Sequence, residues 1–309
     1  MISMRYHAVS IAAVFLALAV GVVLGASGVS DRLLSAVAVD RDDLAVQVRQ
    51  LTLEREQLAG AQRAADEFAA RTGAATVRGV LAGQSVALVT IGTDPADRDA
   101  ITGLLKASGA TYTGELALTE AVGDPARAGQ LRELTASLLP TGAQLPAAAD
   151  TGSLAGGLVG AVLLARDGRP QVTPDQATAV LSGLAAAGFA RPGPAPAPAK
   201  LVLVLTAGSP PTGVDAADTA AVTARFAAQL DRAGGGAVLA GRGGSADPTG
   251  PVGVARADAA IAGAVSTVDD VGSGPGRVSA VLALREQLDG RAGRYGTAAS
   301  ATEGASPAA

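Results

Sequence analysis

An uncharged apolar segment near the start of the chain sets the strongest limit on how this protein can fold. Residues 8–29 carry no charged side chain over 22 positions. At about 1.5 Å per residue, a helix of that length spans the ~30 Å hydrocarbon layer of a bilayer. Arg5 and His7 precede the segment and Asp31 follows it, so the positive-inside rule places residues 1–7 in the cytoplasm. We therefore expect a single-pass protein of the cell membrane whose main domain is extracytoplasmic.

A cleaved signal peptide is the alternative interpretation of this segment. Signal peptides have an apolar region of about 7–15 residues, and this run is longer. Within it, Gly21 and Gly25 form a GxxxG pair, a spacing that lets two membrane helices approach closely. We therefore favour an uncleaved transmembrane helix that packs against a second helix at these glycines.

Residues 31–72 are charged and favour helix, and their apolar positions follow a heptad repeat. The seam consists of Val37, Leu44, Leu51, Leu58 and Ala65, with Val48 on the alternate position. Further alternate positions hold Arg41, Arg55 and Gln62. The repeat predicts a coiled-coil stalk and, together with the membrane glycines, favours a parallel homodimer. A single amphipathic helix lying on its own domain is the alternative.

Between residues 79 and 289, short apolar runs alternate with longer helical patterns. The expected strands are Ser85–Ile91, Ala110–Thr113, Leu201–Thr206, Ala237–Ala240 and Ser266–Val268. The expected helices are 97–108, 125–139, 154–165, 174–187, 216–232, 256–265 and 277–288. Apolar strands that alternate with helices are typical of a parallel sheet covered on both faces. We expect an α/β domain with a Rossmann-like, mainly parallel sheet.

Two segments show neither a helix nor a strand pattern. Residues 191–199 read RPGPAPAPA, a Pro/Ala-rich spacer that should be extended and solvated. It is either a domain linker or a surface loop. Residues 290–309 are rich in Gly, Ala, Ser and Thr, and they predict a disordered tail.

Composition excludes several classes of protein. An apolar fraction of 49% over 309 residues is enough for a buried core. The chain has no cysteine, which excludes disulfides and thiol nucleophiles. A formal charge of -4, with 2% aromatic residues, argues against binding to nucleic acid, whose phosphates need Lys/Arg clusters.

The sequence contains no recognisable catalytic motif. His7 is the only histidine, and it lies at the cytoplasmic edge of the membrane segment, so the outer domain cannot hold a Ser-His-Asp triad. Lys106 and Lys200 are the only lysines and neither follows a glycine, which excludes the nucleotide-binding motif GxxxxGK[ST]. We therefore do not expect an enzyme, a bound cofactor or a metal site.

Polar loops at the carboxyl ends of the predicted strands are the remaining candidates, because parallel sheets bind ligands at this edge. The candidate residues are Asp94, Arg242, Ser245, Asp269, Asp270 and Arg277. Glycine-rich loops near a helix start can bind an anion, and paired aspartates can hold a cation or act in acid–base chemistry. The same residues also suit turns and helix caps. Our hypothesis is that Asp269 and Arg242 face one cleft.

Four sequence segments resemble the mycobacterial copper transport protein B family of actinobacteria. They are the opening M-I-S-x-R-x-H-A-V-S with A-A-V-F-L-A-L-A, then Val238–Ser245, Ser266–Arg277 and Arg294–Gly296. The resemblance runs nearly end to end. It implies an envelope protein of copper efflux or copper tolerance, channel-forming or associated with the outer membrane, and it implies that some relatives act in cell separation with a membrane partner.

Two functions follow from these observations. The first, implied by the resemblance, is copper transport by an oligomeric envelope protein. Cu(I) prefers thiolate, thioether and imidazole ligands, and the chain has none of these after His7. The alternative is a dimeric envelope scaffold that regulates cell separation or cell-wall remodelling through a membrane partner, without binding copper itself.

Overall fold

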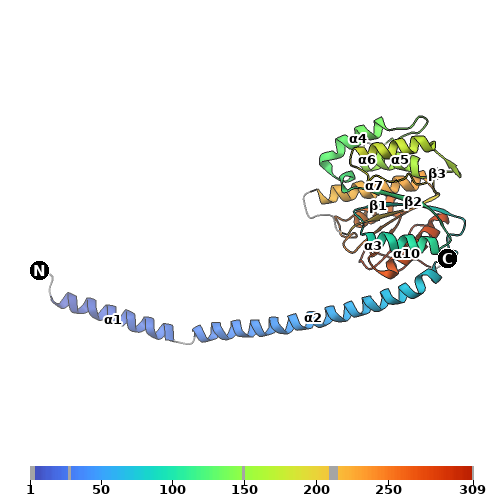
Figure 1. Ribbon diagram of the computed structural model, residues 1–309. Helices are drawn as coiled ribbons and strands as arrows, with labels where there is room; N and C mark the ends of the chain where they lie inside the picture. The colour runs from blue at the N-terminus through green and yellow to red at the C-terminus, as the bar shows by residue number, and fades with distance from the viewer. Residues whose placement is uncertain (1–3, 27–28, 148–149, 209–214, 308–309) are drawn as a thin grey trace. The chain divides into compact units, whose positions relative to one another are not determined.

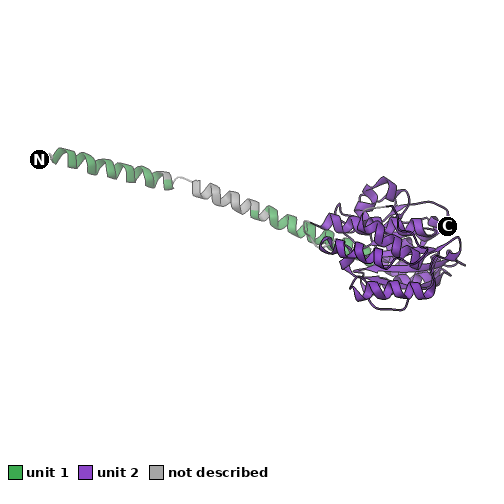
Figure 2. Cartoon of the chain, turned by 90° about the horizontal axis from the view of Figure 1, so that it is seen from above, with its two compact units in different colours: residues 1–63 green, residues 64–309 purple. Residues whose placement is uncertain are grey.

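The protein divides into two compact units, residues 1–63 and 64–309 (Figure 2). The computed structural model describes residues 4–26, 29–147, 150–208 and 215–307, and the side chains of 24, 26, 29–40 and 42 lie outside this description. The first unit contains helix α1 (Met4–Ala26) and most of helix α2 (Val29–Thr76). Within α1, Met4–Val23 is long and apolar enough to cross a membrane. The predicted membrane segment is thus helical over residues 8–26.

Helix α2 is continuous over 48 residues and includes the whole predicted stalk. The described seam residues Leu44, Val48, Leu51 and Leu58 are between 55% and 71% exposed. The side chain of Val37 lies outside the described residues. A single chain does not test helix pairing, so the coiled coil stays a prediction.

The second unit is built on a six-stranded sheet in which every neighbouring pair is parallel (Figure 1). Its strands lie in the order β2-β1-β5-β6-β7-β8. Their bounds are Thr111–Leu118, Ser85–Ile91, Leu201–Thr206, Ala237–Gly241, Ser266–Val268 and Arg294–Tyr295. A short antiparallel pair, β3 (Ala165–Arg166) with β4 (Arg169–Pro170), lies outside this sheet. The predicted α/β fold with a mainly parallel sheet is confirmed.

Helices cover both faces of the sheet (Figure 1). One face packs against α4 (Ala128–Ser137), α5 (Thr151–Leu163), α6 (Pro174–Ala186), α7 (Ala216–Ala233), α8 (Pro251–Ala257) and α9 (Ala259–Ala262). The other face packs against α3 (Pro95–Ala107) and α10 (Gly274–Leu288). Strand side chains alternate between the two cores: Val89 and Val204 lie in the first, whereas Leu88 and Leu203 lie in the second. This two-sided burial explains the continuous apolar strands.

The last turns of α2 pack on α10 within the second unit. The Gly274 amide donates a 2.7 Å hydrogen bond to Asp66 Oδ1. A Cβ placed on Gly73 would lie 2.9 Å from Val278, and one placed on Gly274 would lie 2.7 Å from Ala69. The end of the predicted 31–72 stalk is therefore held by the domain of its own chain.

Three local predictions are wrong. The predicted strand Ala110–Thr113 is longer, Thr111–Leu118, because Gly114 and Glu115 interrupt the apolar pattern of a half-exposed edge strand. The predicted helix 256–265 is two short helices, since the Asp258 side chain accepts hydrogen bonds from Ala260 and Ile261 and starts α9. The 290–309 tail is ordered over 290–307: residues Arg294–Tyr295 form β8, and Tyr295 is 3% exposed.

The Pro/Ala-rich spacer 191–199 is a surface segment and not a domain linker. The halves on either side of it share one sheet, because β1 pairs with β5 over Val86–Ile91 and Leu201–Thr206. The spacer runs beside β2, to which Arg191 and Ala197 donate backbone hydrogen bonds. The spacer therefore does not divide the second unit into two domains.

Small residues on α5 allow it to approach α7 closely. A Cβ placed on Gly156 would lie 2.8 Å from the Phe226 carbonyl oxygen and 2.8 Å from Gln229 Cβ. Gly156→Ala is expected to lower the free energy of unfolding by about 1–3 kcal/mol, because the backbone of α7 cannot move away without opening the core. Gly129 on α4 has open space around it, so Gly129→Ala should instead stabilise by up to about 1 kcal/mol. Urea unfolding of both variants checks that the free energy of unfolding falls in Gly156→Ala and rises in Gly129→Ala.

Candidate functional site

The carboxyl ends of β1, β5, β6 and β7 are the expected ligand edge of this sheet. The chain runs from β1 outward to β2 and then returns to place β5 on the other side of β1. This reversal is a topological switch point, where open α/β sheets place their binding crevices. Asp94 follows β1, Arg242 follows β6, and Asp269 and Asp270 follow β7, so four of the predicted residues do gather at this edge.

An ion-pair network centred on Asp97 occupies this edge beside α3. The Asp97 side chain is 1% exposed, and its Oδ2 accepts a short hydrogen bond from Arg242 Nε. Its Oδ1 lies 2.7 Å from Arg277 Nη2. Arg242 Nη2 also lies 3.0 Å from Asp94 Oδ2. Asp97 thus joins the start of α3, the loop after β6 and the first turn of α10.

The Asp97 network fills the place where an anionic ligand would bind. Asp94 is the N-cap of α3, and its Oδ1 accepts a 2.8 Å hydrogen bond from the Ala96 amide. Two carboxylates already lie at the positive end of the helix and pair with both guanidinium groups, so a phosphate would meet like charge there. The geometry favours a structural network over a nucleotide site.

Charge-assisted hydrogen bonds control the ionisation of Asp97. Burial by itself would raise the pKa of this carboxyl, but the hydrogen bonds from Arg242 and Arg277 outweigh burial and leave the pKa below 3.8. A carboxyl with a lowered pKa stabilises the fold fully above pH 3.8, and this contribution is lost as pH falls through the lower, folded-state pKa.

Asp97→Asn is therefore expected to lower the free energy of unfolding by about 2 kcal/mol at pH 7. The expected loss is below the ~3–5 kcal/mol of a fully buried pair, because Arg242 and Arg277 keep 40% and 24% of their side-chain surface exposed. The difference from the unmodified protein should shrink below pH 4. Urea unfolding between pH 3 and pH 7 measures this difference. Asp99→Asn is the matched control, because the Asp99 side chain is 69% exposed. A stability difference between Asp97→Asn and the unmodified protein that does not depend on pH would contradict a role for the negative charge of Asp97.

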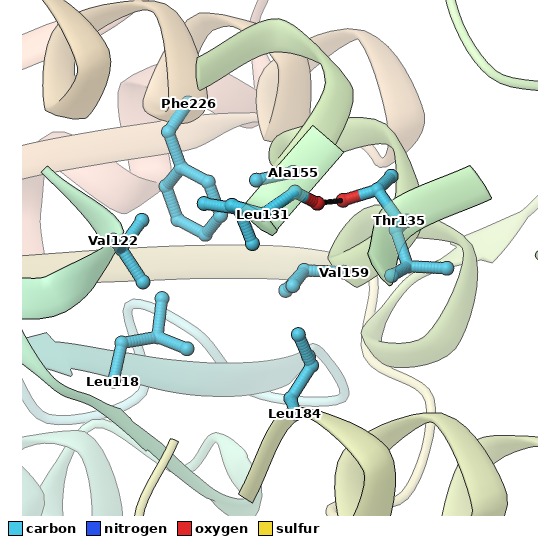
Figure 3. A pocket seen from close by; sticks show the side chains of 9 residues that line it. Leu118, Val122, Leu131, Thr135, Ala155, Val159, Leu184 and Phe226 are labelled. Carbon is cyan, nitrogen blue, oxygen red and sulfur yellow. Dashed lines mark hydrogen bonds between the residues drawn. The ribbon is translucent and has the colours of Figure 1, made fainter. Parts of the chain in front are cut away.

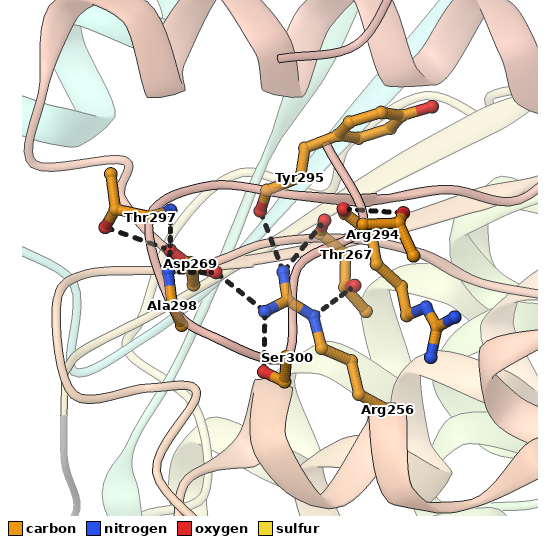
Figure 4. Close-up of polar contacts among 9 residues, drawn as sticks. Arg256, Thr267, Asp269, Arg294, Tyr295, Thr297, Ala298 and Ser300 are labelled. Atoms are coloured by element: carbon orange, nitrogen blue, oxygen red, sulfur yellow. Dashed lines mark hydrogen bonds and ion pairs between the residues drawn. The ribbon is translucent and has the colours of Figure 1, made fainter. Parts of the chain in front are cut away.

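A second network, with a buried ion pair at its centre, surrounds Asp269 (Figure 4). Arg256 Nη1 lies 2.6 Å from Asp269 Oδ2, and both side chains are 2% exposed. Arg256 Nη2 donates to the Tyr295 carbonyl at 2.7 Å, and Nε donates to Thr267 Oγ1 at 3.0 Å. The Thr297 amide donates to Asp269 Oδ1 at 2.8 Å. The carboxylate of Asp269 is thus enclosed by its own chain.

A further set of hydrogen bonds, centred on Glu286, helps to order the C-terminal tail that the sequence predicts to be disordered. The Tyr295 hydroxyl donates a short hydrogen bond to Glu286 Oε2, which also accepts from Ser306 Oγ at 3.2 Å. Burial, together with the Glu286 carboxylate, raises the pKa of Tyr295. Residues 294–306 are fixed by polar groups of the core, and composition does not reveal those partners.

Of the remaining candidates, Ser245 is buried and Asp270 is half-buried. Ser245 is fully buried, and its Oγ has no hydrogen-bond partner among the described residues. Asp270 Oδ2 accepts from Ser273 Oγ at 3.0 Å, and burial raises the pKa of this carboxyl. The structure therefore brings Asp94, Arg242 and Arg277 together through Asp97, and it gives Asp269 a separate set of partners.

An apolar void lies inside the helical layer between α4, α5, α6 and α7 (Figure 3). Its lining includes Leu118, Leu131 and Phe226, and it has about 10 Å³ of space for the centre of a water molecule. A water needs polar partners, and the lining surface here is apolar. This void is a packing defect and not a ligand site.

Comparison with known proteins places the chain in a family. The family described as "Copper transport outer membrane protein, MctB" matches residues 1–305. The chain belongs to the MctB family. It is 40% identical over 306 residues to "Copper transporter MctB" of Mycobacterium tuberculosis (strain ATCC 25618 / H37Rv), covering 96% of each chain. The protein of the same name from Mycobacterium leprae (strain TN) is 40% identical over 314 residues, covering 98% of each.

This MctB family member offers few groups for a soft metal ion. Within the part of the chain that the structure describes, no three His, Cys, Asp or Glu side chains lie close enough together to hold a metal. The sequence has no thiolate, thioether or imidazole after His7, and these are the ligands that Cu(I) prefers.

Proposed function

We propose that this protein is a membrane-anchored cell-envelope protein that takes part in copper transport and copper tolerance. The observation that carries the proposal is the 40% identity to proteins named copper transporter, over 96% of both chains. The apolar stretch Met4–Val23 supports an anchor in the cytoplasmic membrane. The positive-inside rule supports an extracytoplasmic position for the α/β domain.

We infer that the protein acts through assembly and not by carrying copper on its own side chains. The ionised side chains at the carboxyl edge of the sheet pair with one another: Asp97 with Arg242 and Arg277, and Asp269 with Arg256. A hard, oxygen-based set of this kind suits Cu(I) poorly. The copper itself is then handled by an oligomer or by a membrane partner.

Deleting the gene tests the proposal. Cells without the protein should accumulate copper and lose copper tolerance, and the full chain should restore both. A variant that lacks residues 1–26 should not restore them, because it has no anchor. Copper content measured by mass spectrometry that is unchanged by the deletion would overturn the proposal.

A dimeric scaffold that regulates cell separation or cell-wall remodelling through a membrane partner is the second candidate function. The observation that favours it is helix α2, whose 48 residues would extend about 72 Å and expose Leu44, Val48, Leu51 and Leu58. Large apolar side chains exposed at heptad spacing favour a second helix as partner. Under this function, deletion would impair cell separation and leave copper content unchanged.

A further inference from the structure

The two edges of the six-stranded sheet differ in how they are protected. At the β8 edge, the amides of Thr302 and Glu303 both donate to the Arg294 carbonyl, so the C-terminal tail covers that strand. At the other edge, β2 is accompanied by the Pro/Ala-rich spacer. The Arg191 amide donates to the Ala117 carbonyl at 2.8 Å, and the Ala197 amide donates to the Thr113 carbonyl at 3.2 Å. Spacer and strand run in opposite directions.

The spacer is too long to follow β2 between these two contacts. It takes six residue steps from Arg191 to Ala197, whereas β2 takes four from Thr113 to Ala117. Proline alternates with other residues along this part of the spacer and has no N–H to donate. The spacer therefore bulges away from the middle of β2, next to Glu115.

The bulge leaves backbone hydrogen-bonding groups of β2 open. The Ala117 carbonyl points outward to the spacer, and β2 is in regular register with β1 from Gly114 to Leu118. Backbone groups alternate along a regular strand, so the N–H and C=O of Glu115, two residues before Ala117, point outward too. The spacer makes no backbone hydrogen bond to Glu115 in the described structure. An open edge of this kind can pair with another extended chain.

A groove of about 720 Å³ lies over this open edge. One wall is α6, with Leu181, Ala185 and Ala186, and the other is the spacer, with Arg191, Pro192 and Pro194. Apart from Arg191, these wall residues carry apolar side chains. Extended peptides bind such grooves by main-chain pairing, with side chains in the flanking pockets.

Charge at the groove indicates what kind of peptide fits. Arg191 is exposed, and its guanidinium makes no ion pair with any described residue. The carboxylate of Glu115 accepts a 2.7 Å hydrogen bond from Thr90 Oγ1 and lies 3.9 Å from Arg98 Nε. Of the two charged residues that line the groove, Arg191 is therefore the one without an ion-pair partner among the described residues.

We propose that the groove between α6 and residues 191–194 binds an extended segment of a partner protein. The segment pairs with the backbone of Glu115 and places an acidic side chain on Arg191. All residues of this site lie in the α/β domain of one chain, so the proposal depends neither on copper transport nor on dimer formation.

Selection from a random decapeptide display library on the full chain in detergent tests this inference. Enriched peptides should carry an acidic residue and should protect the Glu115 amide from hydrogen exchange. Ala186→Trp, which fills the groove, should abolish their binding. Arg191→Glu should weaken it about tenfold, the loss of one charge-assisted hydrogen bond. Arg225→Glu, at an exposed arginine on α7, is the matched control and should leave binding unchanged.

Two outcomes would overturn the inference. If no peptide is enriched, the groove is not a binding site for extended chains. If enriched peptides bind equally well to Ala186→Trp, they occupy another surface. Circular dichroism of each variant confirms that the fold is retained before binding is measured.

Discussion

Replacing Arg256 with methionine is expected to lower the free energy of unfolding by about 3–5 kcal/mol. The side chains of Arg256 and Asp269 are each 2% exposed, with 2.6 Å between their closest atoms. Methionine keeps most of the apolar length of arginine but leaves Asp269 buried without its counter-ion. The hydrogen bonds to Thr267 Oγ1 and to the Tyr295 carbonyl are lost as well. Urea unfolding of the full chain in detergent, followed by far-UV circular dichroism, measures the change.

A second substitution separates the effect of charge from the effect of shape. In Arg256→Met with Asp269→Asn, no uncompensated charge is buried, so part of the lost stability should return. Arg225→Met, at an exposed position, is the control and should change stability by less than about 0.5 kcal/mol. A loss below about 1 kcal/mol in Arg256→Met alone would show that water or a rearranged tail replaces the arginine.

The parallel sheet could be predicted because most residues of its inner strands β1, β5 and β6 are apolar. Ser85–Ile91, Leu201–Thr206 and Ser266–Val268 agree with the structure to the residue, since helices bury both of their faces. The edge strands β2 and β8 lack a continuous apolar pattern. β2 contains Gly114 and Glu115, and β8 is only Arg294–Tyr295. Edge strands need less apolar surface, so an apolar pattern does not mark them.

The polar networks could be predicted only in part. The position of the loops after β1 and β6 follows from the alternation of strands and helices, which places Asp94 and Arg242 at one edge. The sequence predicts a helix that begins at Asp97, but this residue lies inside α3 and is buried between Arg242 and Arg277. No sequence signal marks Arg256 as the partner of Asp269, because that pairing depends on how α8 packs on β7. Long-range ion pairs of this kind follow from the fold and not from local pattern.

Single cysteines on α2 are expected to show which face of the helix meets a second copy. The chain has no cysteine of its own, so each substitution supplies the only thiol. Leu51 lies on the predicted seam and Leu53 is two residues further, about 200° around the helix. Their exposures in the single chain are 63% and 60%. In a parallel dimer, Leu51→Cys should form a disulfide in most molecules and Leu53→Cys in less than roughly a tenth, because only the first thiol faces its symmetry mate.

The cross-linking experiment uses native membranes and diamide, a copper-free oxidant, and reads the product on a non-reducing gel. Leu58→Cys, one heptad after Leu51, should behave like Leu51→Cys and fixes the register. Equal cross-linking at Leu51 and Leu53 would indicate random collision, and none at any position would leave α2 unpaired and remove the support for a dimeric scaffold. The seam must end before Ala69, because Ala69 and Gly73 already face α10 of their own chain. A dimer through α2 would therefore be joined along the stalk, and each α/β domain would keep its own contacts to the end of the helix.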